Sequence, residues 1–198
     1  MQPAKLNYKI YQGSTFEEVY RWESETKVYV PIQAISKAAP CVVTTSAAHG
    51  VPVGWRFRVV GAGGMKEINS TSESYYIVTE TTDTTLTINQ TNSLGYTAYT
   101  SGGVVEFNQP VPLASYSARM QIRETVDSPS TIYSTTSAVG GHLFLDNATK
   151  TIRVRIPAEV TQAFGFETAV YSIELYESSG LVVPFLGGNL TLVPEVTR

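Results

Sequence analysis

The sequence has very few of the side chains on which most enzyme and metal chemistry depends. Cys41 is the only cysteine among 198 residues, and His49 and His142 are the only histidines. A single cysteine excludes an intrachain disulfide and a cysteine-based zinc site. Two histidines without a cluster of carboxylates are a poor basis for any other metal site. We therefore expect the chain to bind no metal and no other cofactor.

Charged residues and long apolar runs are also scarce. Asp, Glu, Lys and Arg make up 16% of the chain, and the formal net charge is −3, which gives no general attraction to nucleic acid or to an anionic membrane. No apolar run reaches the roughly 20 residues of a membrane-spanning helix. The first residues lack the apolar stretch of a secretory signal. We expect neither a nucleic-acid nor a membrane partner.

The sequence is rich in the residues of strands and turns, including 12 tyrosines and 15 glycines. Strict alternation of apolar and polar residues is the main sign of a half-buried strand. It is clearest in the runs 115–123, 151–156 and 170–177. We predict that one face of these runs points into a core, and that this face holds Tyr116, Met120, Ile122, Ile152, Val154, Ile156, Tyr171, Ile173 and Leu175.

Other segments show weaker patterns. The run 15–22 alternates imperfectly, which predicts a β-bulge near Glu17 and Glu18. A single helical turn is expected between Pro157, which suits the start of a helix, and Gly165, which suits its end. Further strands are expected over 6–11, 142–146, 181–187 and 189–193.

The amino-acid composition and the expected strand lengths change between residues 34 and 107. Thr and Ser dominate there, and the expected strands are short, including 65–68 after a glycine-rich turn. We predict a host domain formed by 1–33 and 108–198, with 34–107 inserted in one of its loops as a second small β-barrel or sandwich domain. The alternative is one continuous β-domain with a long irregular excursion.

His49 and the glycines at 61, 63 and 64 raise the question of an active site with a base and a phosphate cradle. The glycines do not match a phosphate-binding loop, and no helical pattern follows them. They are better interpreted as residues that permit a tight turn. His49 is expected to cap a turn or to pack on Trp55, and Cys41 to be a small buried hydrophobe.

The carboxylates do not suggest an active site either. Glu17 and Glu18 are adjacent, so in a strand they point to opposite faces and do not converge as a glycosidase pair does. Because the sequence shows no set of side chains that could act together in catalysis, we predict that the protein is not an enzyme and has no catalytic, cofactor-binding or metal-binding residues.

The candidates for an interaction surface are arginines and tyrosines. Arg119, Arg123, Arg153 and Arg155 lie on polar strand faces, and we expect them to share one polar face of the host domain. Such arginines form a nucleic-acid footprint, cross-strand ion pairs or an assembly surface. The net negative charge of the chain argues against nucleic acid and favours the other two roles, which are assembly and ion pairs with Glu124 and Glu174 as partners. Tyr96 and Tyr99 are the best candidates for exposed aromatics that could stack on a sugar.

Residues 40–69, 75–88 and 96–103 resemble a small β-module common in phage virion proteins. The matching features are "PCVVTT", a His-Gly turn, "VPVGWRFRVV", "GMKEIN" and a closing "YTSGG". The module is named after the first catalytic-cysteine half-domain of ubiquitin-activating enzymes. The resemblance implies a β-module and no ubiquitin chemistry.

The remaining sequence resembles the immunoglobulin-like N-terminal domain of baseplate upper proteins of tailed bacteriophages. The residues that carry the resemblance are 8–23, 113–124, 140–164, 169–180 and 193–198. It implies an all-β fold, with an immunoglobulin-like antiparallel β-sandwich as the host domain. In such relatives the segment corresponding to 113–124 follows the second strand closely, whereas here the stretch 34–107 separates them.

Together these resemblances imply a structural virion protein of the tail, baseplate or adaptor, assembled in the bacterial cytoplasm. Its expected partners are other virion proteins and copies of itself in a symmetric assembly. The short polar ends, 1–5 and 194–198, are expected to become ordered on a partner. The alternatives are a capsid decoration protein, or a module that binds a carbohydrate on the host surface.

Overall fold

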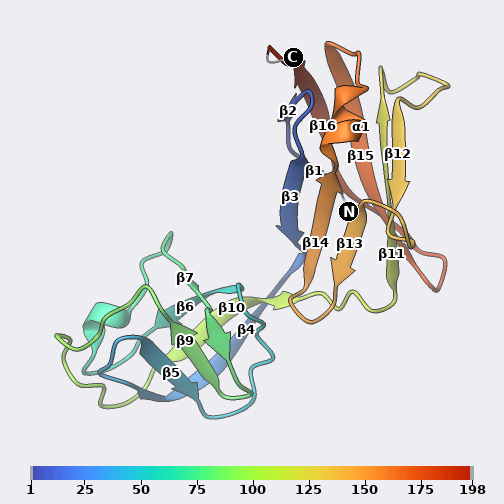
Figure 1. The fold of residues 1–198 in the computed structure, drawn as a ribbon. Coiled ribbons are helices and arrows are strands. Elements are labelled where there is room, and N and C mark those ends of the chain that lie inside the picture. The colour runs from blue at the N-terminus through green and yellow to red at the C-terminus, as the bar shows by residue number, and fades with distance from the viewer. Residues whose placement is uncertain (1, 197–198) are drawn as a thin grey trace. The chain divides into compact units, whose positions relative to one another are not determined.

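The structure is a computed structural model that describes residues 2–196, and it is almost entirely β. The chain forms two compact units (Figure 1). Unit 1 combines Met1–Arg21 with Pro112–Arg198, and unit 2 is Trp22–Val111. In the part of the chain that is described, no helix is long and apolar enough to cross a membrane.

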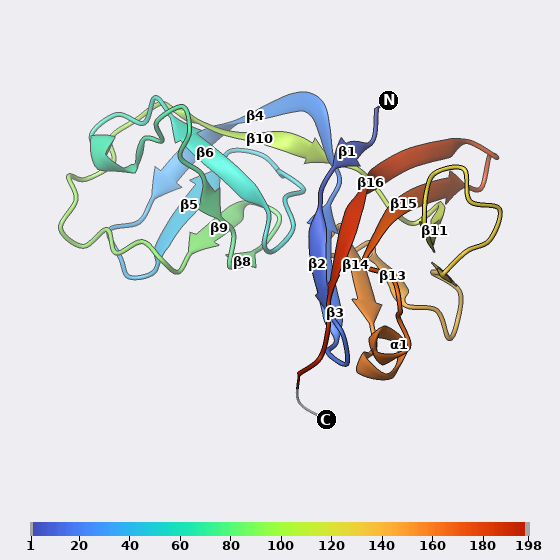
Figure 2. The ribbon, with the colours of Figure 1, turned by 90° about the horizontal axis from the view of Figure 1, so that it is seen from above.

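Unit 1 is a β-sandwich of a six-stranded and a three-stranded sheet. The larger sheet has the order β1-β16-β15-β11-β12, with β2 also paired to β16, and the smaller has the order β13-β14-β3. Seen from above, β13, β14 and β3 form one layer, and β11, β15 and β16 form the other (Figure 2). The strands are β1 (Ala4–Lys5), β2 (Tyr8–Tyr11), β3 (Phe16–Arg21), β11 (Tyr116–Arg123), β12 (Tyr133–Thr136), β13 (Leu143–Asp146), β14 (Thr151–Ile156), β15 (Thr168–Glu177) and β16 (Val182–Val193).

The alternation of the sequence predicts the core of unit 1 well. Of the nine residues predicted to point inward, all but Tyr116 are at most 5% exposed. Tyr116 is only half-buried, because it is the first residue of β11 and lies at the end of the sheet. The side chains between them on the same strands are exposed, such as Arg119 and Arg155, or half-buried, such as Arg153. Period-two patterning therefore sets which face of each strand is buried.

Two details of unit 1 differ from expectation. The predicted bulge near Glu17 and Glu18 is wrong, because β3 pairs with β14 without a register shift from Phe16 through Arg21. The sandwich is also not wholly antiparallel, since β1 and β2 both run parallel to β16. The irregular pattern of β3 arises because Glu18 stands on its inner side, between Phe16 and Tyr20, while Val19 is exposed.

Aromatic rings fill the interior beside β3. The centroid of the Tyr8 ring lies 5.5 Å from that of Phe16 and 6.0 Å from that of Tyr171. Tyr20 meets the ring of Phe185 edge to face at 6.2 Å. The Tyr171 hydroxyl donates a hydrogen bond of 3.0 Å to the Leu6 carbonyl. These tyrosines therefore serve the core, which is the usual use of large aromatics in β-proteins.

The short helix α1 (Ala158–Gln162) follows Pro157 as predicted. Thr161 is fully buried, and its hydroxyl donates to the Ser14 carbonyl at 2.8 Å, which fixes the helix to the turn before β3.

Unit 2 is a small barrel made from a seven-stranded sheet with the order β7-β6-β10-β4-β5-β9-β8. The two end strands are consecutive in the chain, so one short segment joins both ends of the sheet. Val78 donates to the Trp55 carbonyl at 2.9 Å, and Thr79 donates to the Thr87 carbonyl at 2.9 Å, which closes the ring. Its elements are β4 (Glu23–Ile35), β5 (Cys41–Thr45), β6 (Arg56–Val60), η1 (Lys66–Ile68), β7 (Tyr76–Ile77), β8 (Glu80–Thr81), β9 (Thr85–Ile88) and β10 (Val104–Pro110).

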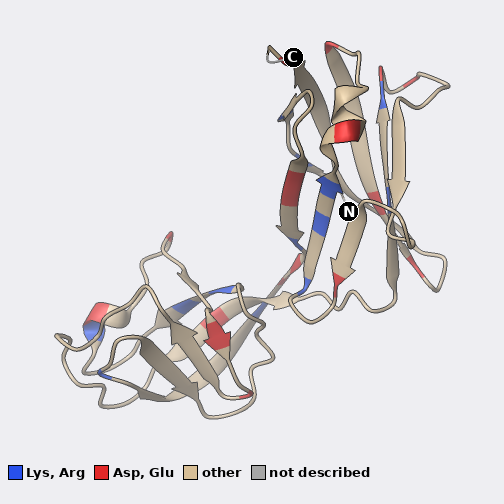
Figure 3. Cartoon of the chain, viewed as in Figure 1, with Lys and Arg blue, Asp and Glu red and all other residues tan. Residues whose placement is uncertain are grey.

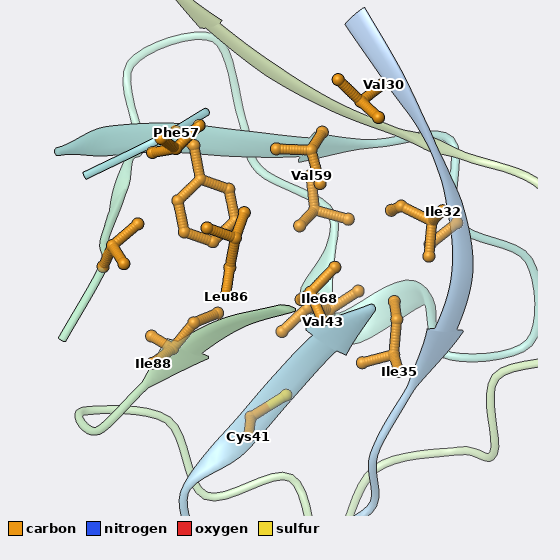
Figure 4. Close-up of a cluster of buried hydrophobic side chains, with 14 of the residues drawn as sticks. Val30, Ile32, Ile35, Cys41, Val43, Phe57, Val59, Ile68, Leu86 and Ile88 are labelled. Carbon is orange, nitrogen blue, oxygen red and sulfur yellow. The ribbon is translucent and has the colours of Figure 1, made fainter. Parts of the chain in front are cut away.

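The barrel has its own hydrophobic core (Figure 4). Trp55, Phe57 and Leu86 are fully buried there, and the Trp55 indole N–H donates to the Asn108 carbonyl at 2.9 Å. The strand predicted over 65–68 is wrong: η1, a 3-10 turn, occupies this segment and places Ile68 in the core.

The sequence-based domain limits, 34 and 107, both fall inside unit 2. Strands β4 and β10 run continuously through these positions and pair with each other, from Val104 opposite Pro31 to Pro110 opposite Glu23. The chain therefore passes from one unit to the other at 21–22 and at 111–112.

Candidate interaction surfaces

His49 is a structural residue of a turn in unit 2. Its side chain is 7% exposed, and Nδ1 accepts a hydrogen bond of 3.0 Å from the Val51 N–H. Burial lowers the pKa of the imidazole below its ordinary value. Of the two roles that the sequence suggests for His49, the structure therefore shows the capping of a turn.

Cys41 lies in the core of unit 2 with no exposed surface, and burial raises the pKa of its thiol. Among residues 2–196, no three His, Cys, Asp or Glu side chains gather in a way that could hold a metal ion.

The glycine-rich segment after β6 has its backbone amides already occupied. The Ala62 N–H donates to Asn69 Oδ1 at 2.8 Å, and the Gly63 N–H to the Ser101 carbonyl at 2.8 Å. A Cβ on Gly64, whose φ is +77°, would lie 2.2 Å from the Ala98 carbonyl oxygen. The glycines thus allow two backbone segments to meet, and these amides are not free to cradle a phosphate.

The four arginines that the sequence selects do not share one surface. Arg119 and Arg123 point outward from β11 in the six-stranded sheet, whereas Arg153 and Arg155 point outward from β14 in the three-stranded sheet. Outward side chains of the two sheets of a sandwich lie on opposite faces. The single polar face assumed from the sequence is therefore wrong, because alternation does not tell to which sheet a strand belongs.

On the six-stranded sheet, the arginines are engaged within the chain. Arg119 pairs with Glu174 at 2.9 Å, as predicted, and its guanidinium lies 5.1 Å from the centre of the Tyr176 ring. The Tyr176 hydroxyl, and after it Arg119, hold the pKa of Glu174 below its ordinary value. Arg123 donates to the Ser128 carbonyl at 2.5 Å and does not pair with Glu124.

On the three-stranded sheet, the basic segments of β14 lie beside an acidic segment of β3 (Figure 3). Arg153 and Arg155 both approach Glu17 at 3.4 Å. Arg153 also covers the ring of Phe144 at 4.5 Å. We call this surface the arginine face; it consists of Glu17, Val19 and Arg21 on β3, Phe144 on β13, and Arg153 and Arg155 on β14.

Exposed apolar side chains flank Arg153 on the arginine face. Phe144 and Val19 stand directly opposite Arg153 on the two neighbouring strands, and they are 40% and 51% exposed. Arginine and aromatic residues together are typical of the energetically important parts of protein interfaces.

Tyr96 and Tyr99 are not exposed stacking platforms, which corrects the expectation from the sequence. Both are half-buried and pack against the core of the barrel. The Tyr99 hydroxyl lies 3.1 Å from the Ile32 carbonyl and 2.9 Å from the Gly102 carbonyl. The loop that carries these tyrosines folds back onto the barrel through long-range contacts, which the local sequence does not reveal.

Sequence reasoning missed a second surface, which lies on the outside of the barrel. Tyr29 and Tyr75 are 56% and 42% exposed, and the Arg56 guanidinium lies 4.8 Å from the centre of the Tyr75 ring. Arg56 is held by Glu23 through contacts of 2.7 to 3.0 Å. The alternation of 27–32 on β4 could have placed Tyr29 outward, but the assumed domain limit cut through that strand.

The N-terminal end is ordered on its own chain. Ala4 and Lys5 form β1 and pair with β16, so the expectation that 1–5 becomes ordered only on a partner is wrong for these residues. At the C-terminal end, Pro194, Glu195 and Val196 are exposed and follow β16. Residues 1, 197 and 198 lie outside the described residues.

Comparison with known proteins gives no further constraint. No protein-family model matches the chain, and no curated protein matches it significantly.

Proposed function

We propose that the chain is a structural component of a tailed-phage virion, in the tail, baseplate or adaptor, and that it acts by binding neighbouring proteins. The kind of particle rests on the sequence resemblances of 8–23, 40–69 and 113–124 to phage virion modules. The partners in this proposal are other virion proteins and further copies of the chain, and the assembly takes place in the bacterial cytoplasm.

The observation that carries the assembly role is the arginine face. A sheet that only protected its own core would gain nothing from Val19 and Phe144 on its outer side, because exposed apolar area is favourable only when a partner covers it. Here both flank an arginine whose aliphatic stem and guanidinium can pack on and pair with a neighbour. The free edges of a small sheet add backbone groups for a neighbouring strand.

The test is the presence of the chain in purified particles of the phage whose genome encodes it. Mass spectrometry and cryo-electron microscopy of these particles should show the chain in many symmetric copies, at the tail rather than over the capsid. A capsid decoration protein would give density on the head. Absence from the particle would contradict both versions.

The contribution of the arginine face is tested with Val19→Ser and Phe144→Ser in one chain. Because both side chains are exposed, the variant should fold, but fewer copies should enter particles. Ser172→Ala, on the outer side of β15, is the matched control and should incorporate normally. Equal incorporation of all three chains would mean that another surface makes the contact.

Binding of a carbohydrate on the host surface is a second candidate, favoured by Tyr29 and Tyr75 on unit 2. Both rings are exposed, and the ring of Tyr75 lies against Arg56, which suits stacking and hydrogen bonding to a sugar. A glycan array with the full chain, repeated with Tyr29→Ala and Tyr75→Ala, tests it. Signals that persist in both variants would contradict a role for this surface.

A further inference from the structure

The arginine face carries more positive than negative charge. Three arginines face outward on it, and Glu17 is the shared partner of Arg153 and Arg155 at the long distance of 3.4 Å. Arg21, at the other end of β3, has no ion pair within the described part of the chain. Asp146 at the edge is engaged by its own turn, where it accepts hydrogen bonds from the Ala148 and Thr149 amides. The guanidiniums are therefore available to carboxylates from outside.

A hollow with the opposite character lies elsewhere on unit 1, where β11 ends and β15 begins. It has a volume of about 580 Å³, and we call it the acidic hollow. Glu124 and Glu167 line it together with two apolar side chains, of which Ile132 is 39% exposed and Phe166 is half-buried. The remaining lining residues are Thr125, Gly165 and Thr168.

Both carboxylates of the acidic hollow lack a cation. Neither Glu124 nor Glu167 forms an ion pair with a residue in the described range 2–196. The neighbouring Arg123 does not neutralise them, because its guanidinium donates to the Ser128 carbonyl and to Gln121. The hollow thus combines an apolar wall with two unpaired carboxylates.

We propose that the arginine face of one copy docks against the acidic hollow of a second copy. This inference rests on the proposed function and names the chain itself as one of the assembly partners. Arg155, whose side chain is 55% exposed, enters between Glu124 and Glu167. Guanidinium–carboxylate pairs of this kind form charge-assisted hydrogen bonds.

Apolar contacts complete the match between the two surfaces. Val19 and Phe144 are the exposed apolar residues of the arginine face, and Ile132 and Phe166 are those of the hollow. The aliphatic stem of Arg155 can lie along Phe166 while its head reaches the carboxylates. Because the two surfaces are different parts of the same chain, a single contact leaves one face and one hollow of the pair unfilled, so the association can continue head-to-tail into a ring or an open row.

The test uses the full chain and two neutral double variants. The hollow variant carries Glu124→Gln and Glu167→Gln, and the face variant carries Arg153→Gln and Arg155→Gln. The average mass of the wild-type chain, followed by light scattering over a concentration series, should rise above 21.6 kDa. Each double variant alone should stay monomeric. Added salt should reverse the association of the wild type, because the pairs are partly exposed.

Mixing the two double variants gives the sharpest result. The intact face of the hollow variant can still dock into the intact hollow of the face variant, but neither complex can grow further. The mixture should therefore reach the mass of a dimer and stop there. Arg119→Gln is the matched control, because it removes an exposed arginine from the opposite sheet, and it should associate like the wild type.

Three results would overturn the proposal: a wild-type chain that is monomeric at every concentration, double variants that associate like the wild type, or a mixture that stays monomeric. Thermal melts of all chains verify folding, and Arg153→Lys with Arg155→Lys, which keeps the charge, should retain part of the association if the face variant is unstable. Failure of self-association with normal incorporation into particles would leave the proposed function intact, whereas absence from particles would remove it.

Discussion

The substitution Ile173→Ala tests whether the two units have independent cores. Ile173 is 1% exposed on β15, with Met120 opposite it on β11 and Leu186 opposite it on β16. The change removes three carbon atoms, worth about 2.4 kcal/mol at about 0.8 kcal/mol for each buried methylene. A residual cavity adds to this cost, so that the loss of unfolding free energy should lie at about 3–4 kcal/mol, within the usual range for such substitutions.

The positions of the tryptophans make the assay specific for each unit. Both tryptophans of the chain, Trp22 and Trp55, belong to unit 2, and Trp55 is fully buried in the barrel core. A Trp22→Phe background therefore leaves Trp55 as the fluorescent reporter of the barrel. Circular dichroism follows the strands of both units. In a guanidinium titration, Ile173→Ala should move the transition of unit 1 in the dichroism and leave the fluorescence transition in place.

The matched change in the other unit is Leu86→Ala, because Leu86 is fully buried in the barrel. It should move the fluorescence transition and spare unit 1. Ser172→Ala, the exposed neighbour of Ile173 on β15, is the surface control and should shift neither transition by more than about 0.5 kcal/mol. If Ile173→Ala moved both transitions together, or cost less than about 1 kcal/mol, the reasoning from separate packed cores would be refuted.

Three further outcomes are expected. His49→Ala and Cys41→Ser should lower the melting temperature of unit 2 and nothing else; a hydrolase or transferase activity that either change abolished would contradict this. Removal of 22–111, with 21 joined to 112 through a short glycine-containing turn, should leave unit 1 folded with a cooperative melt; an insoluble product would count against it. The hydrogen bond from Lys27, and the nearby Arg58, hold the pKa of Glu106 below its ordinary value. The ionised carboxylate therefore stabilises unit 2 at pH values above the unfolded-state pKa of about 4.3. This stabilisation is lost as the pH falls through the lower folded-state pKa. Glu106→Gln should therefore be less stable than the wild type at pH 7 but nearly equal to it at about pH 2, measured by fluorescence-detected melting; an unchanged gap at both pH values would contradict the assignment.

The sequence predicts the burial of single strands far better than their arrangement. Alternation places Ile152, Val154 and Ile173 inside because the inner side of a pleated strand must be apolar wherever a second sheet covers it. The same pattern cannot assign a strand to a sheet, and for this reason Arg119 and Arg153 appear to share a face that they do not share.

Long-range contacts explain the other differences. Residues 65–68 are too short to show a periodicity of their own. The side-chain amide of Asn69 accepts a hydrogen bond from the Ala62 N–H and donates one to the Ala62 carbonyl, and the segment between them forms a 3-10 turn. Tyr99 appears exposed in a loop rich in Gly and Thr, yet its hydroxyl reaches the carbonyl of Ile32, a residue 67 positions away. No local pattern contains such partners.

The closure of unit 2 into a ring decides what kind of contact each unit can make. Val78 and Thr79 join the two ends of the barrel sheet, so within the described residues the ring is continuous and offers no long unpaired strand edge. A foreign strand cannot extend such a ring, which protects the barrel against uncontrolled edge-to-edge aggregation. Recognition by unit 2 must therefore go through side chains such as Tyr29, whereas in unit 1 the outermost strands β3 and β13 still have backbone groups with which another chain can pair.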